Sequence, residues 1–183
     1  MLLASAPASL VRASRLRYPR YVRTCRLQLA RINAASELAQ MSCELIEVGL
    51  AHTWTAMRIA RHIQCPESVV LSAHVERVCA GFAVMQFGED SAHLNLLAVR
   101  PPYQRRGIAR QMLGWLHETA LTAGTFIIRL ELRATSAAAH AFYRALGYRD
   151  AGRSAAYYQG VEDAICMVRD LRVNDGVLRE PNG

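Results

Sequence analysis

The segment from residue 92 to residue 124 constrains the fold most, because a short loop joins a strand to a long helix there. Residues 92–99, AHLNLLAV, form an apolar run of the kind that favours strands. The prolines and glycine of PPYQRRG, residues 101–107, predict a loop. Residues 108–124, IARQMLGWLHETALTAG, place apolar side chains on one stripe and end in a glycine suited to stop a helix. A strand that leads into an amphipathic helix indicates an α/β domain.

Helical spacing also marks residues 37–62, where Gly49 interrupts the pattern. We expect one or two helices in this segment, with an N-cap at Thr53 and an end before Pro66. The side chains expected to face the core are Trp54, Met57, Ile59 and Ala60. Helices therefore precede the sheet.

The other apolar runs are short, rich in residues that favour strands, and separated by polar breaks. The expected strands cover residues 68–74, 77–87, 92–99, 126–133, 148–154 and 163–169, and a short helix with Ser136 as N-cap covers residues 136–147. The first three strands have the pattern of an antiparallel meander. The predicted fold class is α/β (α+β), with a mixed sheet flanked by helices.

The net charge of +7 is concentrated at one end of the chain. Residues 1–31 hold seven arginines and no acidic residue, whereas the remaining fifteen arginines balance all fifteen acidic residues. The body is therefore neutral, which argues against a nucleic-acid surface on the domain. A hydrophobic content of 52% indicates a buried core, and no apolar run approaches the roughly 18 residues of a membrane span.

Three regions follow from this distribution. Residues 1–35 form a basic arm, which we expect to be disordered; its composition also fits an organellar transit peptide or an upstream start codon. Residues 36–171 form the domain, and residues 172–183 form a polar tail. The five cysteines are odd in number, with no CxxC pair and no metal-ligand spacing. Reduced thiols in a cytoplasmic protein without a metal are the expectation, with organellar targeting left open.

The loop before residue 108 has the properties of an anion site. The amides of a first helical turn lack intrahelical partners, and the helix dipole favours negative charge there. Gly107 lets the backbone approach an anion closely. The loop lacks the patterns GxxxxGK and GxGxxG, so a basic loop that simply starts a helix is the alternative.

The sequence LNLLAVRPPYQRRGIARQML, followed at the expected distance by ELRATSAAAHAFYRALGY, resembles the GNAT superfamily of acetyl-CoA-dependent N-acetyltransferases. Residues 104–109 fit that family's pyrophosphate loop, R/Q-x-x-G-x-G/A. The second block, the Tyr-Tyr pair of AYYQG and the final EDAICM are most similar to RimI-type enzymes, which acetylate the first residue of a ribosomal protein. The resemblance covers about residues 36–170 and implies a central mixed sheet of about six to seven strands.

The resemblance implies two catalytic residues. Glu131 matches the glutamate assigned as base in RimI-type enzymes, and Tyr143 matches the tyrosine that protonates or hydrogen-bonds the coenzyme A sulfur. Acetyl transfer from a thioester requires a neutral amine and a proton for the departing thiolate, so these two groups have defined tasks. A solvent-facing strand glutamate and a core tyrosine beside Phe142 are the structural alternatives.

The resemblance also implies binding residues. Acetyl-CoA would be held by main-chain groups of the first middle strand, by the pyrophosphate loop and by the start of the second helix, at Leu97, Ala98, Val99, Gln104, Arg105, Arg106, Gly107, Ile108, Ala109 and Ser136. Ser136 replaces the usual asparagine, so we expect a weaker contact with the pantetheine arm. The resemblance implies that Tyr157 and Tyr158 help to line the groove of the acceptor. Asn95, or His93, could act as a base or contact the substrate, although structural roles are open for all four residues. We expect Asn95 and His93 to lie on one side of their strand with Leu97 and Val99.

Three functions are compatible with these features. The first is an acetyl-CoA-dependent N-acetyltransferase acting on a protein N-terminal α-amine. The second is acetylation of a small amine such as an amino acid, polyamine or antibiotic, because the segment EVGLAHTWTAMRIARHI lacks the SFPxPWS-like stretch common in RimI-type enzymes. The third is a non-catalytic acyl-CoA-binding module whose basic arm binds ribosomal RNA or an acidic partner. The sequence leaves the acceptor and the oligomeric state open.

Overall fold

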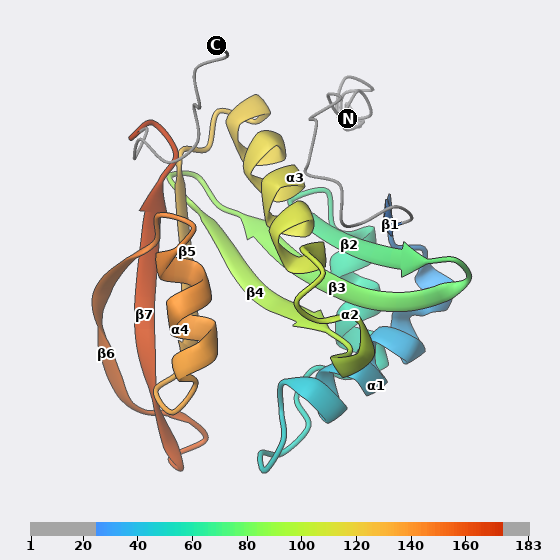
Figure 1. Ribbon diagram of the computed structural model, residues 1–183, viewed down its shortest axis with the longest axis horizontal. Coiled ribbons are helices and arrows are strands. Elements are labelled where there is room, and N and C mark those ends of the chain that lie inside the picture. Colours follow the sequence, from blue (N-terminus) through green and yellow to red (C-terminus); the bar gives the residue numbers. More distant parts are fainter. Residues whose placement is uncertain (1–24, 174–183) are drawn as a thin grey trace, which may run out of the picture.

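The computed structural model describes residues 25–173, which form a seven-stranded sheet with helices on both faces (Figure 1). The elements are β1 (Cys25–Leu29), η2 (Ile32–Ala34), α1 (Ala35–Leu45), α2 (Ala56–Gln64), β2 (Ser68–Val75), β3 (Val78–Phe87), β4 (Ala92–Val99), η3 (Pro101–Tyr103), α3 (Ile108–Thr122), β5 (Ile127–Arg133), α4 (Ala137–Arg144), β6 (Arg149–Tyr158) and β7 (Glu162–Asp170). This confirms the mixed α/β fold, including the meander and the order of the later elements.

The strand order in the sheet is β1-β2-β3-β4-β5-β7-β6. All neighbouring pairs are antiparallel except β4 and β5, which are parallel and joined by the crossover through α3. The parallel pair is short: only Ala92 with Ile128 and His93 with Arg129 are in register. Beyond these pairs the two strands diverge, and Figure 1 shows the sheet opening between them.

Two apolar clusters cover the two faces of the sheet. Leu38 and Met41 of α1 and Ile59 of α2 pack with Phe82 of β3 on one face. Side chains of α3 and α4 pack on the other face, where Leu116 is fully buried. Each helix therefore buries one stripe against the sheet, as an amphipathic helix must.

A β-bulge in β4 changes which way its side chains point. Met85 pairs with Leu94 and Val84 pairs with Leu96, so Asn95 has no partner on β3. Leu94 packs with the α3 cluster, whereas Leu96 packs with the α1 and α2 cluster, although the two residues have the same parity. An unpaired extra residue that reverses the alternation is the mark of a bulge.

The bulge corrects one expectation. Leu97 and Val99 pack against the α3 cluster, as does Leu94, so His93 lies on the opposite side of β4 from Leu97 and Val99. The prediction that all four side chains share one side was wrong. A regular strand alternates without interruption, and nothing in the strand's composition marks the extra residue.

Two local predictions also differ from the structure, and a third is confirmed in position only. Met57 is 65% exposed rather than buried. Thr55, not Thr53, caps α2, since its hydroxyl accepts the Arg58 amide at 3.3 Å. Ser136 lies at the N-cap position of α4, but its side chain makes no capping bond.

The sheet also begins earlier than the boundary expected at residue 36. Strand β1 pairs with β2 from Cys25 to Leu29, so the last part of the predicted arm belongs to the folded unit. Leu27 packs against the α3 cluster. The rest of the arm, residues 1–24, and the tail from residue 174 lie outside the described residues.

Candidate active site

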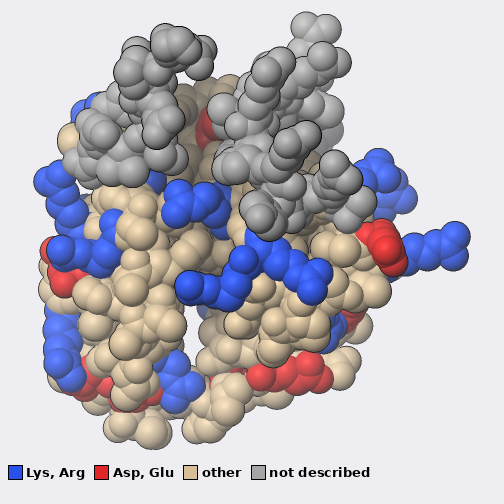
Figure 2. Space-filling view, in the orientation of Figure 1, with Lys and Arg blue, Asp and Glu red and all other residues tan. Residues whose placement is uncertain are grey.

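A cavity of about 480 Å³ lies where β4 and β5 diverge, a size typical of small-molecule sites. Its walls come from the end of α1, the loop before α2, the middle of β4, the end of β5, the start of α4 and the β6–β7 hairpin. Seven of the predicted site residues line it: Asn95, Leu97, Glu131, Ser136, Tyr143, Tyr157 and Tyr158. Figure 2 shows the surface hollowed between the two halves of the molecule, with basic side chains above the hollow.

Glu131 and His93 form the closest polar contact in the cavity. The Oε2 atom of Glu131 lies 2.6 Å from Nε2 of His93, and Nδ1 of His93 lies 3.1 Å from Oδ1 of Asn95. The hydrogen bond from His93 is the main cause that lowers the pKa of Glu131, and the same bond is the main cause that raises the pKa of His93. A carboxylate and an imidazole that share a proton at this distance act as a pair. Such a pair can accept a further proton from a third group.

Asn95 carries an unsatisfied donor. Its Nδ2 atom is buried and has no hydrogen-bond partner among residues 25–173. An unpaired buried donor costs about 1–3 kcal/mol, and such atoms in native proteins call for an explanation. Because Asn95 lines the cavity, a carbonyl oxygen of a bound molecule would supply the missing acceptor.

The two hairpin tyrosines border the same carboxylate. The hydroxyl of Tyr157 donates to Oε2 of Glu131 at 3.4 Å, and its ring meets that of Tyr158 edge to face at 5.1 Å. Burial, followed by the negative charge of Glu131, raises the pKa of Tyr157. Tyr157 is therefore a neutral hydrogen-bond donor at neutral pH.

Tyr143 projects from α4 toward the cavity. Its ring contacts Phe142 and Tyr148 at edge-to-face centroid distances of 5.2 and 5.3 Å, and desolvation by burial raises the pKa of its phenol. Its hydroxyl makes no hydrogen bond within the described part of the chain, so its proton is available to a bound molecule. The side chain of Ser136 is likewise without a capping bond.

The loop before α3 has the backbone of an anion site. Arg105 has a φ of 60° and Gly107 a φ of 82°, both in the left-handed region. Apart from bonds within helices and strands, the amides from Arg105 to Ala109 make no main-chain hydrogen bond in the range 25–173, as expected at a helix start. The side chain of Gln104 instead donates to the Val99 carbonyl at 2.8 Å and fixes the loop to the end of β4.

Other predicted cofactor residues lie outside the cavity. Ala98 and Val99 continue β4 toward this loop, and Ile108 is buried under the first turn of α3. The arginine side chains at positions 105 and 106 are exposed, with Arg106 over the Tyr103 ring at 5.5 Å. The cavity thus lies at the middle of β4, and the loop follows the end of the same strand.

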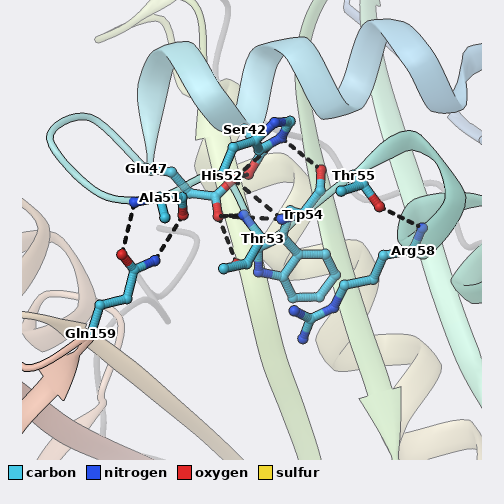
Figure 3. A network of polar contacts seen from close by, with 9 residues as sticks. All are labelled: Ser42, Glu47, Ala51, His52, Thr53, Trp54, Thr55, Arg58 and Gln159. Atoms are coloured by element: carbon cyan, nitrogen blue, oxygen red, sulfur yellow. Dashed lines mark hydrogen bonds and ion pairs between the residues drawn. The ribbon is translucent and has the colours of Figure 1, made fainter.

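The loop between α1 and α2 is held by a buried carboxylate that the sequence did not single out. Figure 3 shows Glu47 accepting hydrogen bonds from the amide and hydroxyl of Thr53, both at 2.7 Å, and from the amide of Trp54. The hydroxyl of Ser42 donates to the other oxygen of Glu47 at 3.2 Å. A buried charge is tolerated here because several donors satisfy it.

The same loop is tied to the hairpin across the cavity. The side chain of Gln159 accepts from the Ala51 amide and donates to the Ala51 carbonyl, both at 2.7 Å (Figure 3). Arg133 donates to the Val48 carbonyl at 2.7 Å and to Glu162 at 2.6 Å. These contacts join segments that lie far apart in sequence, so no local pattern could have predicted them.

Among residues 25–173, no three His, Cys, Asp or Glu side chains are grouped so that they could hold a metal ion. No helix in that range is long and apolar enough to cross a membrane.

Known proteins share parts of this sequence. A family model for the acetyltransferase (GNAT) domain matches residues 66–150. The [ribosomal protein bS18]-alanine N-acetyltransferase of Salmonella typhimurium is 44% identical over 91 residues, which are 48% of this chain and 62% of that protein. The same enzyme of Escherichia coli strain K12 is 42% identical over 91 residues with the same coverage. The match thus spans less than two thirds of these curated relatives.

Solved structures extend the likeness to most of the fold. The crystal structure of the ribosomal-protein-S18-alanine N-acetyltransferase from Escherichia coli has a TM-score of 0.71 and 27% identity, covering 86% of this chain and 100% of that one. Ard1 from Thermoplasma volcanium has a TM-score of 0.72 at 19% identity, covering 81% and 98% of the two chains, and supports the fold alone. Residues 66–150 of this chain thus match the acetyltransferase (GNAT) domain, and the sheet of the whole described range has the fold of these solved structures.

Proposed function

We propose that this protein is an acetyl-CoA-dependent N-acetyltransferase whose acceptor is the α-amine at a protein N-terminus. The observation that carries the proposal is the contact of 2.6 Å between Glu131 and His93 at a cavity between two diverging strands. The likeness to enzymes that acetylate the alanine of a ribosomal protein supports the choice of acceptor.

The residues along β4 and α3 fit acetyl-CoA. The left-handed Gly107 and the free amides from Arg105 to Ala109 match the needs of a pyrophosphate. The parting of β4 from β5 exposes main-chain groups at Leu97 and beyond, which would hold the pantetheine arm and the acetyl carbonyl. Ser136 would contribute its hydroxyl, which is not used as a cap.

The Glu131–His93 pair would remove the proton from the acceptor. An α-amine is mostly protonated below its pKa of about 8, and only its neutral form is nucleophilic. Glu131 receives this proton directly or through a water, and His93 shares it across their hydrogen bond. Tyr157 donates to the same Glu131 oxygen and helps to fix the carboxylate's position.

Tyr143 would act on the leaving group of the reaction. Acetyl-CoA supplies a thioester, whose cleavage leaves a thiolate. Because burial raises the pKa of Tyr143, its phenol stays protonated and can donate a hydrogen bond to that sulfur. In this proposal the base lies on β5 and the donor on α4, two elements whose side chains line the same cavity.

The test is acetyl transfer by the purified full chain from acetyl-CoA to an alanine-initiated peptide, followed by release of free thiol and by mass spectrometry of the peptide. We expect acetylation at the α-amine only. A panel of free amino acids and polyamines is run in parallel, and faster turnover of any of these would contradict the choice of acceptor. If no acetyl-CoA binds in calorimetry, the whole proposal is wrong.

A further inference from the structure

The side chain of Arg58 is held flat against the wall of the cavity. Its guanidinium carbon lies 3.9 Å from the centre of the Trp54 ring, and Figure 3 shows the two groups stacked. Trp54 is buried, and its amide is fixed by Glu47. A guanidinium stacked on an aromatic face is oriented, while the donors at its edge remain free for in-plane hydrogen bonds.

The other charges in the cavity are neutralised by partners within the protein. Glu131 is bonded to His93, and Arg133 is bonded to Glu162 and to a main-chain carbonyl. The buried Glu47 accepts from several donors. Within residues 25–173, no carboxylate lies at ion-pair distance from the Arg58 guanidinium. The positive charge of Arg58 therefore faces the cavity unpaired.

This charge lies on the side of the cavity where the acceptor would enter. Arg58 and Tyr157 both line the cavity, where the positive charge of Arg58 partly offsets the rise in the pKa of Tyr157, and the Tyr157 hydroxyl is 3.4 Å from the Glu131 carboxylate. An extended peptide advances about 3.3–3.6 Å per residue. Arg58, Glu131 and Tyr157 line the same cavity, so a peptide with its α-amine at Glu131 that leaves past Tyr157 would bring its next side chains to Arg58.

We propose that Arg58 binds the carboxylate of an acidic side chain at the second or third position of the acceptor peptide. The inference rests on the proposed function and adds the class of peptide to it. A guanidinium matches a carboxylate with two parallel hydrogen bonds, whereas it repels a basic residue or a polyamine at the same place. Arg58 thus selects acidic N-termini against basic ones.

The experiment compares kcat/KM for alanine-initiated peptides that differ only in having Glu, Gln or Arg at positions two and three. For the full chain we expect the Glu peptide to exceed the Arg peptide by about tenfold or more, and the ratio to fall as salt is added. Arg58→Glu is expected to invert the order, and Arg58→Gln to bring the ratio close to one. The Gln variant keeps the test decisive if charge reversal disturbs folding.

Arg61→Glu is the matched control. Arg61 lies on the same helix and is exposed, but its guanidinium contacts Met57 and does not line the cavity. The Arg61→Glu variant should keep the same ratio of kcat/KM between the Glu and Arg peptides as the unaltered chain. Equal turnover of the three peptides would overturn the inference, and so would a preference that Arg58→Glu leaves unchanged. In both cases the turnover itself would still support the proposed function. No turnover of any peptide would overturn both, and faster turnover of free glutamate would overturn the assignment to a peptide.

Discussion

Glu131 and His93 are 38 positions apart in sequence, and the parallel register of β4 and β5 brings them together. His93 pairs with Arg129, so Glu131 lies on the same face two residues along, where the strands begin to part. The parting leaves room for a substrate beside the pair without breaking its hydrogen bond. Glu131 can serve as a base that shares its proton with a partner only because His93 lies beside it.

The pH dependence of turnover follows from this pair. The pKa of His93 is raised from about 6.5, so below that raised pKa the pair already holds a proton and accepts another poorly. We expect kcat to rise as the pH increases through the pKa of His93. In His93→Gln, Glu131 alone sets the lower limb, which should move toward pH 4–5 with a reduced plateau. Profiles of both proteins with the same peptide check this, and identical lower limbs would contradict a role for His93.

Tyr143 and Tyr148 form a matched pair of buried tyrosines with different tasks. The Tyr143 hydroxyl has no protein partner in the described range, whereas the Tyr148 hydroxyl lies 2.9 Å from Nε2 of His117. Burial lowers the pKa of His117 to about 3, so His117 stays neutral. Tyr143→Phe should reduce kcat about 100-fold with little change in stability. Tyr148→Phe should leave kcat unchanged and cost about 1 kcal/mol in the free energy of unfolding.

Steady-state kinetics and urea unfolding of the two variants provide the comparison. If Tyr143→Phe retained full kcat, its phenol would be a packing group, and the non-catalytic alternative would gain support. The two substitutions remove the same atom from neighbouring rings, so a general effect of losing a buried hydroxyl would appear in both.

At the scale of elements, the sequence predicted most helices and strands but missed the features that shape the cavity. Strand limits in the meander followed from apolar runs, and the end of α3 followed from Gly124. The bulge at Asn95 depends on pairing with β3, which no local pattern reveals. Thr53 was expected to cap a helix, but buried Glu47 takes both of its donors and leaves the cap to Thr55.

The hairpin and the α1–α2 loop act as one wall because Gln159 bonds both main-chain groups of Ala51. Gln159→Ala removes both bonds and should let the two segments separate. We expect KM for the peptide to rise several-fold with kcat nearly unchanged, because the base and donor do not move. Gln40→Ala, which removes an exposed bond to Glu44 on α1, is the control. A change in kcat alone would show that the wall positions catalytic groups instead.

The two ends of α3 allow a test of the anion loop. Gly107 and Gly124 have φ values of 82° and 77°, so valine is strained at both positions by about 1–2 kcal/mol. Gly107→Val should raise the Kd for acetyl-CoA about tenfold or more, because the loop amides shift. Gly124→Val should destabilise the fold by a similar amount without changing that Kd. Calorimetry and thermal unfolding separate the two effects, and equal Kd values for both variants would contradict the loop assignment.

For the whole molecule, the order of elements and the class of fold could be predicted, because each element has its own periodicity and stop signals. The candidate base and the tyrosine donor came from resemblance, and the structure places both on the cavity. His93 was considered only as a possible base or substrate contact beside Asn95, and Arg58 was not singled out, since the importance of both depends on neighbours that are distant in sequence or on the absence of a partner. The domain boundary expected at residue 36 was placed too late, because the Arg-rich composition of the arm gave no sign of strand β1.

That strand provides the last prediction. Residues 25–29 pair with β2 along five register positions, Ser72 donates to the Gln28 carbonyl at 3.2 Å, and Leu27 packs against the core. A chain starting at residue 36 therefore exposes the edge of β2 and loses apolar burial of about 2 kcal/mol, which lowers Tm by roughly 4–8 °C relative to a chain starting at residue 25. An exposed edge also favours association, so the shorter chain should aggregate more readily on heating. Calorimetry and light scattering on the two chains decide the matter, because equal Tm values would mean that β1 is dispensable and that the folded unit begins at α1.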